Sequence, residues 1–128
     1  MNKVLASISV GTLLALAVPG VAGASHGGGG KTVKGTCSAS SSSKIKVNAD
    51  DSRIETEFEV DSNQVGQVWK VTLSDNGTVV AKGKATTAAP SGSFEFRRRI
   101  ANQAGTDTIT ANAKNKATGE TCSATVSL

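Results

Sequence analysis

The feature that most constrains the fold is a run of alternating residues followed by an Asn-Gly pair. From Trp69 to Leu73, apolar and polar side chains alternate, which is the pattern of a strand with one buried face. Asn76-Gly77 then supplies the two residues that favour a type I′ turn, so we predict a hairpin whose second strand covers 78–85. Trp69 is the only tryptophan and the chain has no tyrosine, so we expect this ring to anchor the core.

Similar alternation predicts further strands after residue 30. The clearest run lies between Arg53 and Val60, where apolar residues and a threonine share one face and three glutamates share the other. No segment beyond the N-terminal residues has a helical period. We therefore predict an all-β domain of seven to eight strands, arranged as a two-sheet sandwich. Besides Trp69, the expected aromatic core residues are Phe58, Phe94 and Phe96, and the other expected strands lie at 31–37, 44–47, 94–99, 107–114 and 122–128.

Residues 1–24 have the composition of a secretory signal peptide. A lysine precedes a mostly apolar run at 4–18, and Ala22-Gly23-Ala24 fits the small-x-small rule for cleavage before Ser25. The alternative is a membrane anchor, but the run is shorter than the roughly 20 residues that a span needs. We therefore predict a secreted, extracellular protein with no membrane span after cleavage.

The rest of the chain is predicted to be a flexible glycine-rich tether, 25–30, followed by one domain, 31–128. Cys37 and Cys122 are the only cysteines, and an even count in an exported protein favours a disulfide. A reactive thiol pair would call for C-x-x-C spacing, which is absent. We therefore predict one structural disulfide that closes most of the domain into a loop.

Three motifs resemble those of bacterial immunoglobulin-like and fibronectin type III-like domains. The tryptophan strand with Asp75-Asn76-Gly77 resembles strands C and C′, residues 104–111 resemble the E–F corner and strand F, and 116–119 resemble the F–G turn. The corner tyrosine is missing, and the cysteines lie near the first and last strands. The chain is also similar to small secreted proteins of actinobacteria. The resemblance implies an immunoglobulin-like sandwich of bacterial origin.

In such a sandwich strands B and E are adjacent, which would bring two charged runs together. Glu55, Glu57 and Glu59 would then lie across from Arg97 and Arg99. We favour a cross-strand ladder of opposite charges. The alternative is a calcium or cationic-ligand surface, but calcium sites usually converge several oxygens from a loop.

Arg98 interrupts this pattern because alternation points it inward, beside Phe96 and Ile100. Either a β-bulge turns it outward, or it reaches a carboxylate such as Asp107. The run of arginines at 97–99 is also a conceivable docking point for an anionic wall polymer, a lipid head group or nucleic acid. Three residues are few for that role.

Catalytic chemistry is hard to place in this chain. Residues 31–128 contain no histidine, which excludes Ser-His and Cys-His pairs and histidine metal sites from the domain. The carboxylates lie on strands or turns with outward spacing, so we expect no pair of acids facing one cleft. His26 would bind copper(II) or nickel(II) only if cleavage left Ala24 as the terminus. We predict a protein that is not an enzyme and uses no cofactor or metal.

A nucleic-acid partner is not expected either, since it calls for a basic stripe and aromatic stacking platforms, and the aromatics are assigned to the core. We therefore predict a recognition or structural module at the cell envelope, with an unidentified protein or envelope partner. The alternative is a small secreted effector, such as an enzyme inhibitor, that presents a loop from a disulfide-tied scaffold. The loop that we would nominate is Thr86–Ser93.

Overall fold

The computed structural model describes residues 30–128. Two predictions lie outside this range: the signal peptide, and the tether residues 25–29, which include His26. The described part contains strands and no helix, which confirms the all-β prediction. None of it forms a helix that could cross a membrane. The strands are β1 (Lys31–Lys34), β2 (Thr36–Cys37), β3 (Ser42–Asp50), β4 (Arg53–Asp61), β5 (Val68–Asp75), β6 (Thr78–Thr86), β7 (Ser93–Ala101), β8 (Thr108–Asn115) and β9 (Thr121–Ser127).

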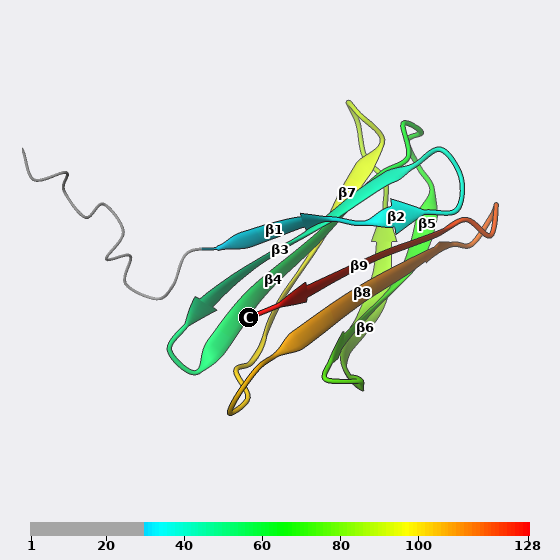
Figure 1. Ribbon diagram of the computed structural model, residues 1–128. Coiled ribbons are helices and arrows are strands. Elements are labelled where there is room, and N and C mark those ends of the chain that lie inside the picture. The colour runs from blue at the N-terminus through cyan, green and yellow to red at the C-terminus, as the bar shows by residue number, and fades with distance from the viewer. Residues whose placement is uncertain (1–29) are drawn as a thin grey trace, which may run out of the picture.

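These strands form two antiparallel sheets that pack face to face (Figure 1). Sheet A has the order β1-β3-β4-β7, and sheet B has the order β2-β9-β8-β5-β6. The predicted two-sheet sandwich is therefore confirmed. The structure has more strands than expected because the predicted strand 31–37 divides into β1, which joins sheet A, and β2, which joins sheet B.

Gly35 permits this crossing from one sheet to the other. A Cβ added at Gly35 would clash with the side chain of Ser43 in sheet A and with the carbonyl of Ser123 in sheet B. Immediately afterwards, Cys37 lies in register with Cys122 of β9, and the two form the predicted disulfide. The disulfide is confirmed, and it fixes a strand of only two residues to the sheet.

The core lies between the sheets and takes every second residue from most of the long strands, whereas β6 adds only the half-buried Ala81 and Ala85. Trp69 and Phe58 are completely buried, while Phe96 and Phe94 are 2% and 6% exposed. The rings of Trp69 and Phe94 lie with their centroids 6.0 Å apart, within the range of favourable aromatic pairs. Because alternate residues face the core, the remaining side chains of each strand are free to lie on the two outer faces.

The predicted β5–β6 hairpin turns at Asn76 and Gly77, whose φ angles of 50° and 84° are the positive values of a type I′ turn. Asn76 also fastens the turn to the loop before β8. Its amide Nδ2 donates to the carbonyl of Thr106 at 3.1 Å, and its Oδ1 accepts the backbone N–H of Thr108 at 2.9 Å. One asparagine therefore serves both the turn and its tertiary anchor.

Next to this anchor, Asp75 and Asp107 form a buried pair of carboxyl groups. Their exposures of 3% and 1% contradict the expectation that the acids all point outward. Asp107 accepts the backbone N–H of Gln103 at 3.1 Å, whereas no donor in the described chain reaches either oxygen of Asp75. Burial, together with a hydrogen bond to Asp107 and the charge of Asp107, raises the pKa of Asp75 to about 6. When Asp75 is protonated, its carboxyl group can donate to Asp107, which removes the repulsion between two buried charges.

This pair predicts that the protein loses stability as pH rises. A carboxyl whose pKa is about 6 when folded and 3.8 when unfolded binds its proton more tightly in the folded state. Its stabilisation is complete below pH 4 and disappears as pH rises through 6, by about 3 kcal/mol on the usual conversion of pKa to free energy. Urea unfolding between pH 4 and 7 measures this slope. Asp75→Asn should flatten the slope, and a wild-type protein that became more stable across this window would contradict the account.

Candidate functional site

The outer face of sheet A carries the predicted charge ladder in part. β4 and β7 are neighbours, and their register sets Glu57 opposite Arg97 and Glu55 opposite Arg99. The Nε atom of Arg97 lies 3.2 Å from a carboxylate oxygen of Glu57. Within residues 30–128, Glu55 and Arg99 form no ion pair with each other. The register therefore supplies two rungs of opposite charge, and only one of them is an ion pair.

Glu59, the third glutamate of the ladder, has a like charge opposite it, because the register pairs it with Glu95. Carboxylate oxygens of Glu57, Glu59 and Glu95 come within 4.8 Å of one another, closer than the parallel spacing expected along one strand. Arg97 binds two of these groups, so the acidic cluster is already partly neutralised. The other ion pairs of this face are Arg97–Glu95 at 2.8 Å, Lys44–Glu59 at 3.7 Å and Arg99–Asp50 at 3.8 Å.

Arg98 follows neither of its two predicted arrangements. The β4–β7 register continues through it without a bulge, and its guanidinium reaches no carboxylate in the described chain. The side chain instead lies over the ring of Phe96, with Cζ 3.9 Å from the ring centroid, and donates to the carbonyl of Arg97 at 2.7 Å. Gly83 of β6 leaves room for it, because a Cβ there would lie 3.2 Å from Nη2 of Arg98. Arg98 therefore covers the edge of the core where β6 and β7 meet.

The nominated loop, Thr86–Ser93, is held close to the body of the protein. Thr87 is buried, donates its hydroxyl to the carbonyl of Gln64 and accepts the backbone N–H of Gln67. The backbone of Ala88 pairs with Ser93 to close the loop. Thr86 and residues 88–91 are exposed, whereas Thr87 and Gly92 are buried.

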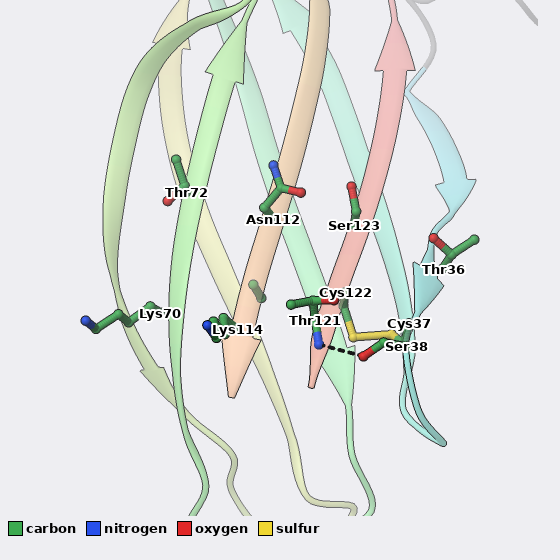
Figure 2. Close-up of a pocket in the computed structure, with 11 residues that line it drawn as sticks. Thr36, Cys37, Ser38, Lys70, Thr72, Asn112, Lys114, Thr121, Cys122 and Ser123 are labelled. Carbon is green, nitrogen blue, oxygen red and sulfur yellow. Dashed lines mark hydrogen bonds between the residues drawn. A yellow bond between two sulfur atoms is a disulfide. The ribbon is translucent and has the colours of Figure 1, made fainter. Parts of the chain in front are cut away.

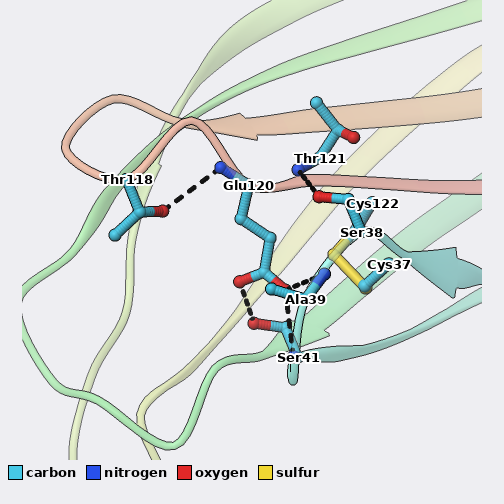
Figure 3. The surroundings of a disulfide bond; sticks show 8 residues. All are labelled: Cys37, Ser38, Ala39, Ser41, Thr118, Glu120, Thr121 and Cys122. Atoms are coloured by element: carbon cyan, nitrogen blue, oxygen red, sulfur yellow. Dashed lines mark hydrogen bonds between the residues drawn. A yellow bond between two sulfur atoms is a disulfide. The ribbon is translucent and has the colours of Figure 1, made fainter.

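Beside the disulfide, Glu120 organises the serine-rich loop after β2 (Figure 3). Its Oε2 accepts the backbone N–H groups of Ala39 and Ser41 at 3.1 and 3.0 Å, and its Oε1 accepts the hydroxyl of Ser41 at 2.6 Å. The carboxylate is thus committed to structure, as are the sulfur atoms of Cys37 and Cys122 near it.

A lysine row on the outer face of sheet B is the feature that the sequence reasoning missed. We define it as Lys84, Lys70 and Lys114, which lie in register on the adjacent strands β6, β5 and β8. All three are exposed. Lys70 therefore has a like charge directly opposite it on both sides, an arrangement that destabilises a sheet.

No acidic residue balances the lysine row. The four long strands of sheet B contain one carboxylate, Asp75, and it points into the core. No ion pair in residues 30–128 involves a lysine of the row. Lys116 lies just beyond it, and the positive charges of Lys84 and then Lys70 lower the pKa of its ammonium group. The face therefore concentrates positive charge that nothing within the described chain neutralises.

The lysine row borders a shallow groove of about 500 Å³ that crosses the strands of sheet B (Figure 2). Lys70 and Lys114 lie at one end of the groove, and Lys84 lies beyond it. Hydroxyl and amide side chains line the remainder together with Cys37, Ala113 and Cys122. Such a surface can bind an anion by charge and adjacent polar groups by hydrogen bonds. Its polar lining consists of Thr36, Ser38, Thr72, Asn112, Thr121 and Ser123.

Comparisons with protein-family models, curated proteins and solved structures gave no match for this chain.

The two rungs of the charge ladder offer an internally controlled stability test. We expect a double-mutant cycle of Glu57→Gln with Arg97→Gln to give a coupling free energy of about 0.5 kcal/mol, because the pair is in contact but exposed. The matched cycle of Glu55→Gln with Arg99→Gln should give none, since that pair makes no contact. Equal coupling in both cycles, measured by urea unfolding, would show that the coupling free energy depends on the strand register and not on direct contact between the side chains.

Arg98 gives a second test on the same strand. We expect Arg98→Ala to cost about 1 kcal/mol of unfolding free energy, because it removes a cation–π contact and uncovers the edge of the core. Arg99→Ala should cost less than about 0.5 kcal/mol, since Arg99 makes only a long, exposed ion pair. Equal, small losses in thermal or chemical unfolding would show that Arg98 does not cover the core.

Proposed function

We propose that this protein is a secreted, non-enzymatic recognition module that binds an anionic ligand of the cell envelope through the lysine row. The observation that carries the proposal is the register of Lys84, Lys70 and Lys114 on three adjacent strands without a neighbouring acid. Repulsion among these groups lowers the stability of the free protein. A bound anion neutralises these charges and removes the repulsion, so the charge pattern favours anion binding.

Protection of a sheet edge is the structural alternative, since lysines on edge strands prevent aggregation. It accounts for Lys84, because β6 is the edge strand of sheet B. It does not account for Lys70 and Lys114, because β5 and β8 are paired on both sides. Charge on the central strands supports a role in binding.

The disulfide supports the export part of the proposal, since such bonds are typical of extracellular proteins. The strand order β9-β8-β5-β6 supports an immunoglobulin-like assignment, because it corresponds to G-F-C-C′ in variable-type domains. Sheet A departs from that pattern at its edges: β3, β4 and β7 correspond to strands A, B and E, while β1 is an additional strand beside β3 and no strand beyond β7 corresponds to D. The proposed relation is therefore with the immunoglobulin-like class in the broad sense.

The binding test uses poly-L-glutamate as an anionic probe in low salt. We expect the double variant Lys70→Gln/Lys114→Gln to bind it at least about tenfold more weakly than wild type, since each exposed charge contact contributes about 1 kcal/mol. The same variant should unfold at a higher urea concentration, because like charges across the strands are removed.

The charge-matched control is Lys34→Gln/Lys46→Gln, which removes two lysines from sheet A. It should bind nearly as well as wild type. Equal loss of binding in both double variants, measured by calorimetry, would show that only net charge matters and would reject the lysine row as the site.

A further inference from the structure

Two parallel rows of side chains cross sheet B at right angles to its strands. The first row continues the lysine row, because Lys114 is in register with Thr121 of β9. The backbone N–H of Thr121 in turn donates to the hydroxyl of Ser38 at 2.9 Å. The second row lies two residues further along each strand. Its members, in order from β6 to β2, are Lys82, Thr72, Asn112, Ser123 and Thr36.

The groove lies between these rows, as Figure 2 shows for Lys70, Lys114, Thr72, Asn112 and Ser123. Because neighbouring strands are about 4.8 Å apart, the four strands that line the groove give a track of roughly 14 Å. Lys82 and Lys84 of β6 extend the two rows to roughly 19 Å. Its chemistry changes along its length. The β6–β5–β8 end carries ammonium groups, and the β9–β2 end carries hydroxyl groups only, with the amide of Asn112 between them.

The polar groups along the second row are free to bind. In residues 30–128, no side-chain hydrogen bond is made by Thr72, Asn112 or Ser123. Elsewhere on the same face, Thr108 and Ser127 bond each other at 3.1 Å, and so do Thr110 and Thr125 at 3.2 Å. The hydroxyl groups of Thr72 and Ser123 are therefore unpaired within the groove, whereas these four hydroxyl groups outside it are paired.

Asn112 is the least expected residue in this position. Asparagine is depleted in strands, because its side chain competes for backbone hydrogen bonds. It lies here on the exposed face of β8, a central strand, where a threonine or valine would stabilise the sheet better. Its amide both donates and accepts hydrogen bonds, which is the capacity needed to bind a hydroxylated ligand.

We propose that the groove binds an extended acidic polysaccharide that lies across the strands of sheet B. This inference rests on the proposed function and adds the class of ligand. Acidic groups of the polymer pair with the lysine row, and sugar hydroxyls bond Asn112 and the hydroxyl groups of Ser123 and Thr36. All of the aromatic rings in the described part of the chain lie in the core, so the groove offers no ring on which a neutral sugar or a nucleic-acid base would stack.

The test compares three polymers of matched length on the disulfide-bonded protein: polygalacturonate, poly-L-glutamate and dextran. Polygalacturonate has both charge and hydroxyl groups, poly-L-glutamate has charge alone, and dextran has hydroxyl groups alone. We expect polygalacturonate to bind about fivefold more tightly than poly-L-glutamate, from one or two added hydrogen bonds. Dextran should not bind, because it lacks the charge.

Two double variants test whether the amide and hydroxyl groups of the groove contribute to binding. Asn112→Ala/Ser123→Ala should reduce the affinity for polygalacturonate to that for poly-L-glutamate and leave poly-L-glutamate unchanged. Thr108→Ala/Ser127→Ala, on the same two strands but outside the groove, is the control and should change neither affinity.

Equal affinity of wild type for the two acidic polymers, or no effect of Asn112→Ala/Ser123→Ala, would overturn the polysaccharide inference and leave the anionic site standing. Failure of wild type to bind either acidic polymer would overturn both proposals.

Discussion

The burial of alternate side chains between two sheets is the constraint on which the rest of this structure depends. Trp69 and the phenylalanines fill the space between sheets A and B, and every core strand must follow their period. The outward-facing residues do not have to fill the core, so their identity reflects solvation, pairing with neighbouring side chains or ligand binding. Sheet A uses its outer face for mixed charges that pair with each other. Sheet B places positive charges side by side, which stability alone does not favour.

Local pattern was sufficient to predict much of the fold. The alternation from Trp69 and the Asn76-Gly77 pair predicted the β5–β6 hairpin, because both signals act over a few residues. The disulfide was predictable from the cysteine count. The division of the first strand was not, since Gly35 matters only through contacts with Ser43 and Ser123, which are distant along the chain.

The candidate site could not be predicted from the sequence for a similar reason. Lys70, Lys84 and Lys114 are spread over three segments, and each one alone resembles an ordinary solvated residue. They become a site only through the pairing of β5 with β6 and with β8. The same limit explains Asp75 and Asp107, whose turn-like surroundings predicted exposure. Their burial arises because the β5–β6 turn packs against the loop before β8.

The most direct test of this account is a map of amide chemical-shift changes, recorded by NMR while short polygalacturonate chains are added. The account predicts changes that cross sheet B from Lys84 through Lys70 and Asn112 to Thr36, with sheet A unaffected. Changes centred on Arg97 in sheet A, or on the tip of the 86–93 loop, would contradict it and place the binding surface elsewhere.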